Sequence, residues 1–356
     1  MTSLRRTLAV CGPTASGKSD LSIHLAQNLG GEIVNVDSVQ VFRELDIGSA
    51  KLKEADRCGI PHHVLDIFAP NEAANVASFR QQALHSIDDI ISRDRLPILV
   101  GGSGLYLTAL LHGLAEVPPT PADVREAVAS LSLTEQYAEL QRVDPASATR
   151  LNPNDSQRIS RAVEICRITG RPASDILAEH TFTSVDVVSL VLVICKPRNE
   201  LYDRIDRRAS EMIKAGLVAE AARIRDRYGQ VSALSTLGYK QACDYLDGNM
   251  PEEAIAREIA LHTRRFAKRQ MTYWRNEPMK RGWVVRPTEQ EPAQFVSGFE
   301  EFPVRAQKHI KGFRAFSWNR EELVERVRAR LRVALDTDPL SHTEVWFVTE
   351  KEQLPV

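Results

Sequence analysis

The chain has 356 residues, 43% of them hydrophobic and 26% charged, so it is long enough for a sizeable core and has the composition of a globular protein. Its net charge of -1 excludes a basic surface spread over the whole chain, although a local basic surface stays open. Five scattered cysteines, none in a Cys-x-x-Cys pair, argue against a disulfide framework or a zinc site.

The first predicted strand and helix flank a glycine-rich segment near the start of the chain. The apolar stretch before that segment is too short for a signal peptide, and no later run reaches the ~20 apolar residues of a membrane helix. We therefore expect a cytoplasmic protein without membrane contact. Residues 8–11 form a short apolar strand, and apolar residues then recur near a helical period from 19 to 29, where Gly30-Gly31 ends the helix.

Three further apolar runs predict buried strands, at residues 32–36, 96–100 and 187–194. These runs are continuously apolar and are separated by helical patterns, which is typical of a parallel sheet covered on both faces. We predict an α/β fold with a P-loop parallel-sheet core, an inserted helical domain and a C-terminal extension.

The predicted domain organisation has four segments. The first part of the P-loop core takes residues 1–117, a helical insertion takes 118–183, the second part of the core with basic C-terminal helices takes 184–284, and an extension of unknown role takes 285–356. The insertion starts at a proline-rich boundary, 118–121, and is helical and polar to about residue 177. We expect the extension to be a separate appendage with a helix at 320–335 and a short strand at 345–348.

The glycine-rich segment matches the pattern G-x-x-x-x-G-K-S through Gly12, Gly17, Lys18 and Ser19, between a predicted strand and a predicted helix. Backbone N–H groups of such a loop and of the following helix N-terminus cradle phosphate, and the glycines permit close approach. Lys18 adds a positive charge, and the Ser19 hydroxyl can bind Mg²⁺. The pattern predicts a phosphate site and, taken alone, favours a kinase or an NTPase.

Asp37 follows the second predicted strand, at the edge where sites form in open parallel sheets. Three interpretations of this residue are open. Its carboxylate binds Mg²⁺, takes a proton from a nucleophile, or only caps a turn. The residue and its position do not distinguish among them.

Seven segments, taken together and in order, resemble the signature blocks of the tRNA dimethylallyltransferases, also called tRNA isopentenyltransferases. They are residues 36–51, 60–66, 100–106, 155–164, 204–208, 237–240 and 263–270. The resemblance extends over about residues 6–283 and is far more specific than the phosphate loop alone. It implies transfer of a dimethylallyl group from dimethylallyl diphosphate to N6 of adenosine 37 in tRNA, giving N6-(dimethylallyl)adenosine and diphosphate.

The resemblance also implies roles for individual residues. Asp37 is the expected general base, and Arg208 is expected to add positive charge on the leaving group. The diphosphate is expected on Gly12, Pro13, Thr14, Ala15, Ser16, Gly17, Lys18 and Ser19, with Mg²⁺ near Ser19. The expected tRNA contacts are Asp37, Ser38, Val39, Gln40, Ser103, Arg125, Gln157, Arg158, Ile159, Ser160, Arg161, Ser235, Thr236, Leu237, Gly238, Tyr239 and Lys240. The helical insertion is expected to clamp the tRNA anticodon stem-loop.

A local excess of positive charge lies at residues 257–281, with eight lysines or arginines, two acids and interleaved aromatic residues. This composition fits either a surface for the RNA phosphate backbone or a solvated helix whose aromatic side chains face the core. The family resemblance favours RNA and adds Arg264, Lys268 and Arg269 to the expected tRNA contacts. Some aromatic side chains of this segment, which include Trp274 and Trp283, are still expected in the core.

Two alternatives stand beside the transferase. A P-loop small-molecule kinase would consume ATP with a small acceptor and would need no RNA. A non-catalytic tRNA-binding protein would bind RNA through the basic segment, and its phosphate loop would be vestigial. The joint presence of the loop, Asp37 and the basic segment disfavours both. We expect a monomer whose cofactor is Mg²⁺ and whose partners are dimethylallyl diphosphate and a tRNA anticodon stem-loop.

Overall fold

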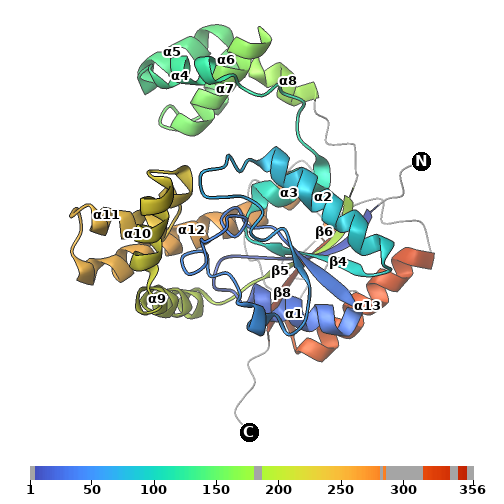
Figure 1. Cartoon of the computed structure of the whole chain (residues 1–356). Helices are drawn as coiled ribbons and strands as arrows, with labels where there is room; N and C mark the ends of the chain where they lie inside the picture. The colour runs from blue at the N-terminus through green and yellow to red at the C-terminus, as the bar shows by residue number, and fades with distance from the viewer. Residues whose placement is uncertain (1–4, 180–186, 281–283, 286–315, 337–343, 351–356) are drawn as a thin grey trace. The chain divides into compact units, whose positions relative to one another are not determined.

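The structure is a computed structural model that describes residues 5–179, 187–280, 284–285, 316–336 and 344–350 (Figure 1). The strands among these residues form one sheet of eight, in the order β3-β2-β4-β1-β5-β8-β6, with β7 paired to β8. Every pairing is parallel, so the predicted parallel-sheet core is confirmed. The strands are β1 (Arg5–Cys11), β2 (Gly31–Asn35), β3 (His62–His63), β4 (Leu96–Gly101), β5 (Val187–Ile194), β6 (Val284–Val285), β7 (Phe316–Trp318) and β8 (Glu344–Glu350).

The central strands are buried on both faces, which explains their continuously apolar sequences. In β1, Leu8 and Val10 pack into one hydrophobic cluster, whereas Ala9 and Cys11 pack into another. Because successive side chains of a strand point to opposite faces, these two clusters are the two layers on either side of the sheet. Hydrophobic residues at consecutive positions are what a sheet with two covered faces requires.

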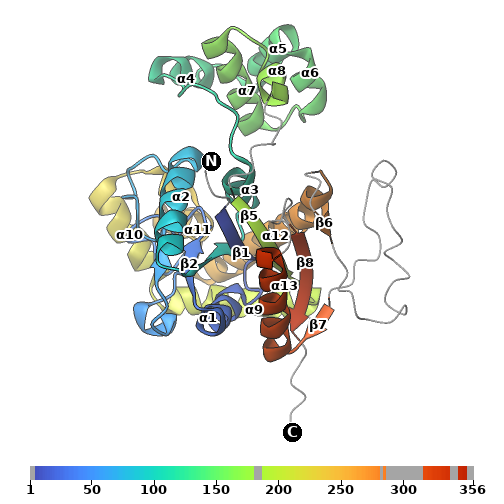
Figure 2. The same ribbon diagram turned by 90° about the vertical axis from the view of Figure 1, so that its right-hand side faces the viewer.

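Helices cover each face of the sheet. Helix α1 (Lys18–Leu29) and helix α13 (Arg320–Asp336) pack with one cluster and lie side by side (Figures 1 and 2). The other cluster contains residues of α2 (Val76–Ser92), α3 (Gly104–His112), α9 (Arg198–Lys214), α10 (Leu217–Tyr228), α11 (Tyr239–Leu246) and α12 (Glu252–Lys280). Two short 3-10 helices, η1 (Glu54–Arg57) and η2 (Ser232–Ser235), interrupt the loops. None of the described helices is long and apolar enough to cross a membrane.

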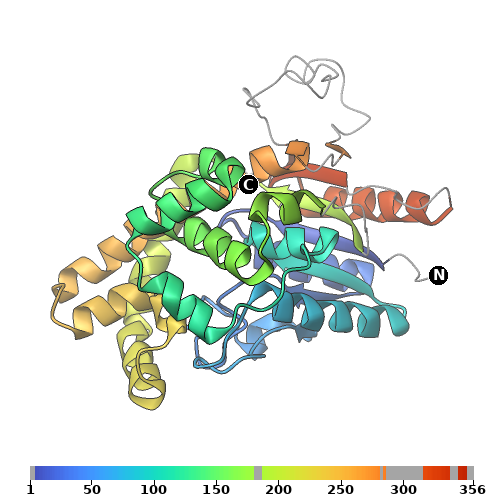
Figure 3. The same cartoon turned by 90° about the horizontal axis from the view of Figure 1, so that it is seen from above.

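Residues 112–185 form a compact unit of their own, and the rest of the chain forms the second unit. The unit contains five helices among its described residues and is drawn in green in Figure 3. They are α4 (Ala122–Ala129), α5 (Leu133–Val143), α6 (Pro145–Arg150), α7 (Ser156–Thr169) and α8 (Ala173–Glu179). Its core is small and is built around Leu140, Ile159 and Val163, each fully buried. The helical pattern read in residues 123–177 is therefore present as five short helices.

The C-terminal extension differs from its prediction in one respect. The helix predicted at 320–335 and the strand predicted at 345–348 are both present, as α13 and β8. They do not form a separate appendage, because β8 is hydrogen-bonded between β5 and β6 in the main sheet (Figure 2). The physical reason lies in β8 itself: Val345, Trp346 and Val348 are buried, on both faces of the strand, as in a central strand.

Candidate active site

The glycine-rich loop runs from β1 to α1 in a conformation that depends on its glycines. Gly12 has φ +140°, and a Cβ there would lie 2.8 Å from the carbonyl oxygen of Ile194 at the end of β5. Gly17 has φ +94° and precedes α1 without a side-chain cap on the helix N-terminus. The first N–H groups of α1 therefore have no capping side chain among the described residues, which leaves them available to an anion.

Lys18 and Ser16 add polar side chains to this loop. The Nζ of Lys18 donates a hydrogen bond to the Pro13 carbonyl oxygen at 2.7 Å, so the lysine folds back along the loop. Burial lowers the pKa of Lys18 to about 8, and the nearby Asp37 carboxylate partly opposes this shift. The Ser16 hydroxyl is buried and has no hydrogen-bond partner in the described part of the chain. An orphaned buried hydroxyl in a phosphate loop fits a bound oxyanion.

Two arginines of α9 bring further positive charge to the pocket. The Nε of Arg204 donates to the Ala15 carbonyl oxygen at 2.8 Å and so fastens the loop. Arg208 lines the same pocket. Burial lowers the pKa of Arg208, and the Arg204 charge adds to that shift, whereas Glu211 and Asp20 oppose it. A guanidinium stays protonated in proteins, so the pocket holds cations close together before any anion binds.

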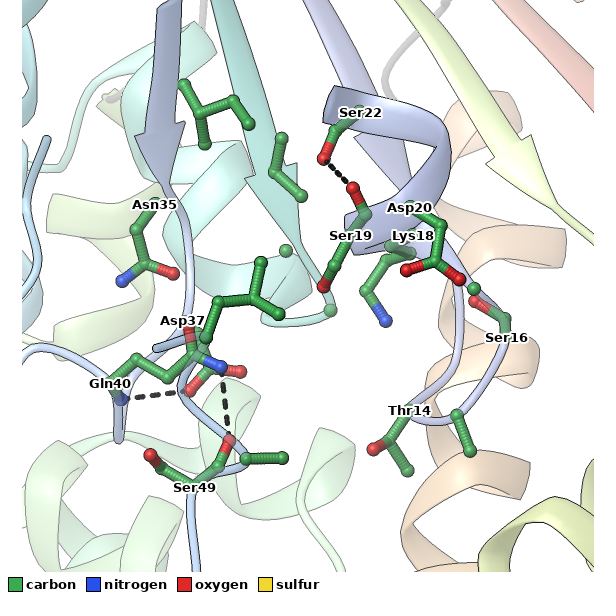
Figure 4. Close-up of a pocket in the computed structure, with 18 of the residues that line it drawn as sticks. Thr14, Ser16, Lys18, Ser19, Asp20, Ser22, Asn35, Asp37, Gln40 and Ser49 are labelled. Carbon is green, nitrogen blue, oxygen red and sulfur yellow. Dashed lines mark hydrogen bonds between the residues drawn. The ribbon is translucent and has the colours of Figure 1, made fainter. Parts of the chain in front are cut away.

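Asp37 lies across the pocket from the phosphate loop (Figure 4). Its Oδ1 accepts hydrogen bonds from the N–H groups of Val39 at 2.8 Å and Gln40 at 3.3 Å. The carboxylate therefore caps a turn, which is one of the three interpretations that the sequence left open. Its Oδ2 has no hydrogen-bond partner among the described residues and remains free to accept a proton or bind a ligand. The Gln40 side chain donates to the Ser49 carbonyl oxygen at 3.0 Å and closes this side of the pocket.

Buried polar groups of α10 and α11 hold the loop after Asp37 in place. The Glu220 carboxylate accepts the N–H of Ile47 at 3.0 Å and the hydroxyl of Tyr239 at 2.5 Å, and Tyr239 in turn accepts the N–H of Gly48 at 3.1 Å. Burial, reinforced by Glu220, raises the pKa of Tyr239 well above its usual range. Lys51, whose side chain is 4% exposed, pairs with Asp46 at 2.6 Å and Asp66 at 2.5 Å. These contacts give the Asp37 turn a rigid support.

Several residues predicted to contact tRNA have side chains that are buried in a core or paired with another residue of the protein. Tyr239 is fully buried beneath Gly48, and Ile159 is fully buried in the core of the helical unit. Arg264 forms a bidentate ion pair with Asp206 and lies 5.4 Å from the ring centre of Tyr202. The sequence alone does not indicate these partners, because they belong to distant segments of the chain. Tyr239 and Ile159 could reach RNA only if the core opened, so we leave both out of the proposed RNA surface.

Other predicted residues are exposed or half-exposed. Ser235 and Lys240 are exposed, and in the helical unit the side chain of Arg158 is 75% exposed and that of Arg161 46%. Gln157 on α7 and Arg125 on α4 are also exposed. Ser160 donates to the Gln136 side chain at 2.6 Å.

Helix α12 separates its cations from its buried residues. Arg265, Lys268, Arg269 and Arg275 are exposed and make no ion pair within the described residues; we call these four the basic face of α12. Trp274 is fully buried, as expected for some aromatics of this segment, whereas Trp283 lies outside the described residues. The guanidinium of Arg269 lies 5.6 Å from the ring centre of Phe266, which lines the pocket.

Several pocket residues were not predicted individually, and three of them are polar groups next to the predicted ones. Arg204, Gln270 and Asn35 line the pocket beside the predicted loop, Asp37 and Arg208. Arg204 and Gln270 belong to segments that carry the family resemblance, so the signal was present, but their contacts with the loop depend on the packing of α9 and α12. Asn35, at the end of β2, gave no signal beyond its place in a strand.

Comparisons with known proteins agree with the resemblance read from the sequence. A family model described as IPP transferase matches residues 40–277, and one described as isopentenyl transferase matches residues 6–66. The chain is 44% identical over 274 residues to tRNA dimethylallyltransferase 1 of Citrifermentans bemidjiense, which covers 76% of this chain and 90% of that protein. It is 43% identical over 278 residues to the tRNA dimethylallyltransferase of Halorhodospira halophila, covering 76% and 90%.

Solved structures give the same result. The tRNA isopentenylpyrophosphate transferase of Bacillus halodurans has a TM-score of 0.56 and 37% identity, over 76% of this chain and 87% of that one. A eukaryotic dimethylallyltransferase acting on tRNA has a TM-score of 0.69 and 26% identity, over 82% of this chain and 76% of that one.

Proposed function

The chain belongs to the IPP transferase family of tRNA dimethylallyltransferases, and from this premise we propose how its pocket works. The reaction is the transfer of a dimethylallyl group from dimethylallyl diphosphate to N6 of adenosine 37 in tRNA, which gives N6-(dimethylallyl)adenosine and diphosphate. One observation carries the assignment of the site: a single pocket has a phosphate loop and half-buried cations on one side and the Asp37 carboxylate on the other (Figure 4).

The phosphate-loop side holds the leaving group. When the bond between the allylic C1 and the diphosphate oxygen breaks, the bonding electrons go to that oxygen and negative charge builds on the diphosphate. The N–H groups of the loop, Lys18 and Arg208 stabilise this charge because they are fixed before the reaction starts. Arg204 keeps the loop in place through the Ala15 carbonyl oxygen. The Ser16 hydroxyl would gain in a phosphate oxygen the partner that it lacks.

The Asp37 side receives the acceptor base. The exocyclic N6 of adenine is a weak nucleophile, so precise placement next to C1 contributes much of the rate. As the N6–C1 bond forms, N6 loses one proton, and the Oδ2 of Asp37 is the proposed acceptor. The Oδ1 of the same carboxylate accepts hydrogen bonds from the N–H groups of Val39 and Gln40, so the loop that contains Asp37 orients this proposed general base.

We propose Mg²⁺ as the cofactor, held by the Ser19 hydroxyl. Ser19 lies at the start of α1 and lines the pocket next to Lys18 (Figure 4). No group of three or more acidic, histidine or cysteine residues among the described ones forms a metal cage. This donor set fits Mg²⁺, which usually takes few protein ligands and completes its shell with phosphate oxygens and water. When bound, the ion supplies positive charge against the diphosphate oxygens.

On the main unit, the proposed RNA contacts are the basic face of α12, the Ser38–Gln40 turn with Ser103, and the exposed residues Ser235 and Lys240. The helical unit separately offers Arg125, Gln157, Arg158 and Arg161. The four cations of the basic face make no ion pair within the described residues and suit the phosphate backbone, to which they contribute charge without sequence preference. Lys240, Arg158 and Arg161 each form an ion pair within the protein, which phosphate would have to replace. Adenosine 37 must leave its stack to reach a pocket, which costs least in a single-stranded loop such as the anticodon loop. We expect the enzyme to act as a monomer in the cytoplasm.

The kinase and the non-catalytic RNA-binding protein are not favoured. Membership of the family over residues 40–277 supports transfer to tRNA rather than to a small acceptor. The phosphate loop, Asp37 and the two arginines of α9 line one pocket, which a protein that only binds RNA does not need.

The proposed function is tested by product analysis. The purified protein is incubated with dimethylallyl diphosphate, Mg²⁺ and unmodified tRNAs that carry adenosine 37, and the tRNA is then digested to nucleosides and analysed by mass spectrometry. We expect one adenosine, at position 37, to gain a five-carbon group. Absence of any modified nucleoside from several such tRNAs would refute the proposal, and ATP consumption with a small acceptor would favour the kinase.

A further inference from the structure

Gln270 is a buried residue of α12 that bridges two loops of the pocket. Its side chain is 7% exposed. Its Oε1 accepts a hydrogen bond from the Thr14 N–H at 2.9 Å, and its Nε2 donates to the Gly102 carbonyl oxygen at 2.9 Å. Thr14 belongs to the phosphate loop after β1, and Gly102 follows β4, the neighbouring strand. One side-chain amide thus ties together the carboxyl ends of two adjacent strands.

The two partners determine how the Gln270 amide is oriented. A backbone N–H can only donate and a backbone carbonyl can only accept, so the amide oxygen faces Thr14 and the amide nitrogen faces Gly102. Because Thr14 already donates to Gln270, its N–H is not available to a phosphate. The diphosphate is therefore left with the later N–H groups of the loop, near the start of α1, where the cations also lie.

The segment between β4 and α3 packs tightly against α12 at two successive turns. A Cβ at Gly102 would overlap the Gln270 amide, and a Cβ at Gly104 would overlap the Tyr273 ring. The Tyr273 hydroxyl donates to the Gly104 carbonyl oxygen at 2.8 Å. Residues 102–104 are therefore fixed to α12 from both ends, and there is no space for the segment to approach further.

Ser103, between these two glycines, connects the segment to the turn of the proposed base. Its hydroxyl accepts the N–H of Ser38 at 3.3 Å, directly after Asp37. Gln270 is thus linked to the phosphate loop by one bond and to the Asp37 turn by a short chain of contacts. The leaving group and the proton acceptor both take their positions from the same residue.

We propose that Gln270 is a positioning residue that fixes the phosphate loop relative to the Asp37 turn, so that diphosphate and adenine meet at the distance that transfer requires. Both polar atoms of its amide are bonded to the chain, so it acts through Thr14 and Gly102. The proposal rests on the proposed function of the pocket, because it concerns the spacing of the groups that perform the transfer.

The first test replaces the amide with an apolar side chain of similar length, Gln270→Met. Binding of inorganic diphosphate with Mg²⁺ is measured by calorimetry, binding of tRNA by filter retention, and transfer by steady-state kinetics. We expect diphosphate affinity and kcat/KM each to fall about tenfold or more, because Thr14 and Gly102 lose a buried partner. Affinity for tRNA is expected to stay within about twofold, because the exposed cations of the helix are unchanged.

The second test uses Gln270→Glu, whose side chain has nearly the same shape. The activity ratio, which is the activity of the variant divided by that of the unchanged enzyme, is measured at each pH. An ionised carboxylate accepts from Thr14 but cannot donate to Gly102, and its charge repels the diphosphate. The protonated acid restores both bonds, and burial favours that form. We therefore expect the activity ratio to rise as the pH falls, whereas the ratio for Gln270→Met stays flat. A residue that only fills space would give no such recovery.

Thr263→Val is the matched control. Thr263 is buried on the same helix, and its hydroxyl donates to the Ile259 carbonyl oxygen of that helix at 2.6 Å, with no contact to the loop. It should bind diphosphate as the unchanged enzyme does. Normal diphosphate binding and turnover in Gln270→Met would overturn the proposal, and so would an activity ratio for Gln270→Glu that is independent of pH. If the unchanged protein itself binds no diphosphate, the proposed function fails and the positioning role fails with it.

Discussion

The phosphate pocket and the basic face of α12 lie close together in the fold but are built in opposite ways. In the pocket, polar groups are buried or half-buried and bonded to the chain: Lys18 to Pro13, Arg204 to Ala15 and Gln270 to Thr14. On the basic face, by contrast, the four cations are exposed and make no ion pair with any described residue. Gln270 and the cations Lys268 and Arg269 are neighbours in sequence yet belong to these two different environments.

This difference separates two ways of handling phosphate. Buried groups held by fixed bonds act through geometry in a low-dielectric site, so a displaced or missing atom changes the rate steeply. Exposed cations act through long-range charge, contribute nearly independently and are screened by salt. The same chemical group, a phosphate, is therefore expected to be held rigidly when it is the leaving group and loosely when it belongs to the RNA backbone. Substitutions at Asp37, at Lys18 and on the basic face probe this contrast, and a substitution at Arg328 tests the extension.

The largest effect is expected at Asp37. Asp37→Asn keeps an oxygen that can cap the turn through Val39 but removes the base, whereas Asp37→Ala removes both. We expect turnover with Asp37→Asn to fall about 10²–10⁴-fold, the range typical of a lost general base. Binding of tRNA should change little. Single-turnover transfer with labelled dimethylallyl diphosphate measures the effect, and unchanged turnover in Asp37→Asn would remove Asp37 as the proton acceptor.

Lys18 is expected to come next, with a loss of about 10²-fold or more in kcat/KM for Lys18→Met, because one fixed charge on the leaving group is gone. The pKa of Lys18 is lowered to about 8, so in the free enzyme the lysine loses its charge as the pH rises through that value. Affinity for inorganic diphosphate should therefore fall above about pH 8 in the unchanged protein. Calorimetry from pH 7 to 9.5 checks this, with Lys18→Met as the reference whose binding lacks this component. Equal pH dependence in both proteins would contradict it.

The basic face should respond more weakly. Lys268→Ala and Arg269→Ala are each expected to weaken tRNA binding severalfold and to reduce the slope of log affinity against log salt by about one. At saturating tRNA, kcat should be unchanged. Arg257→Ala is the control, because Arg257 lies on the same helix but has a 3.7 Å contact with Glu258 that offsets its charge. A drop in kcat with unchanged tRNA affinity would mean that the basic face belongs to the chemistry rather than to RNA binding.

The smallest effect is expected in the C-terminal extension. Arg328 donates to the Asn28 carbonyl oxygen in the last turn of α1 at 2.9 Å, and α1 has no basic residue of its own there. Arg328→Ala should lower stability by about 0.3–1 kcal/mol through the loss of this helix-end interaction and leave transfer intact. Thermal melts measure the effect. A large loss of transfer would show that the extension supports the phosphate loop through α1.

The sequence predicted the parts of the fold whose signal is local. The apolar runs gave β1, β2, β4 and β5 to within a few residues, and Gly30, at φ +68°, ends α1 as its position indicated. The phosphate loop was also readable, because its function depends on backbone shape that only certain residues permit. The separate appendage was a wrong prediction, because a short strand such as β8 carries no information about which strand it will pair with.

The candidate site was predictable only in part, for the same reason. Asp37 and Arg208 were identified through family blocks, and both line the same pocket as the loop. Those blocks do not indicate which way a side chain points: Tyr239 and Ile159 lie in segments that carry the family resemblance, yet both are buried in the core. The bridging contacts of Arg204 and Gln270 join residues 189 and 256 positions apart, and no local pattern predicts such pairs.

The proposed coupling is that the phosphate loop holds a diphosphate which leaves only when tRNA supplies the acceptor. It is tested most directly by following, in one reaction with Mg²⁺, the diphosphate released and the five-carbon groups gained by adenosine 37. We predict equal amounts at every time point and no diphosphate release without tRNA. Diphosphate release that proceeds without tRNA, or that exceeds the groups transferred, would contradict the account.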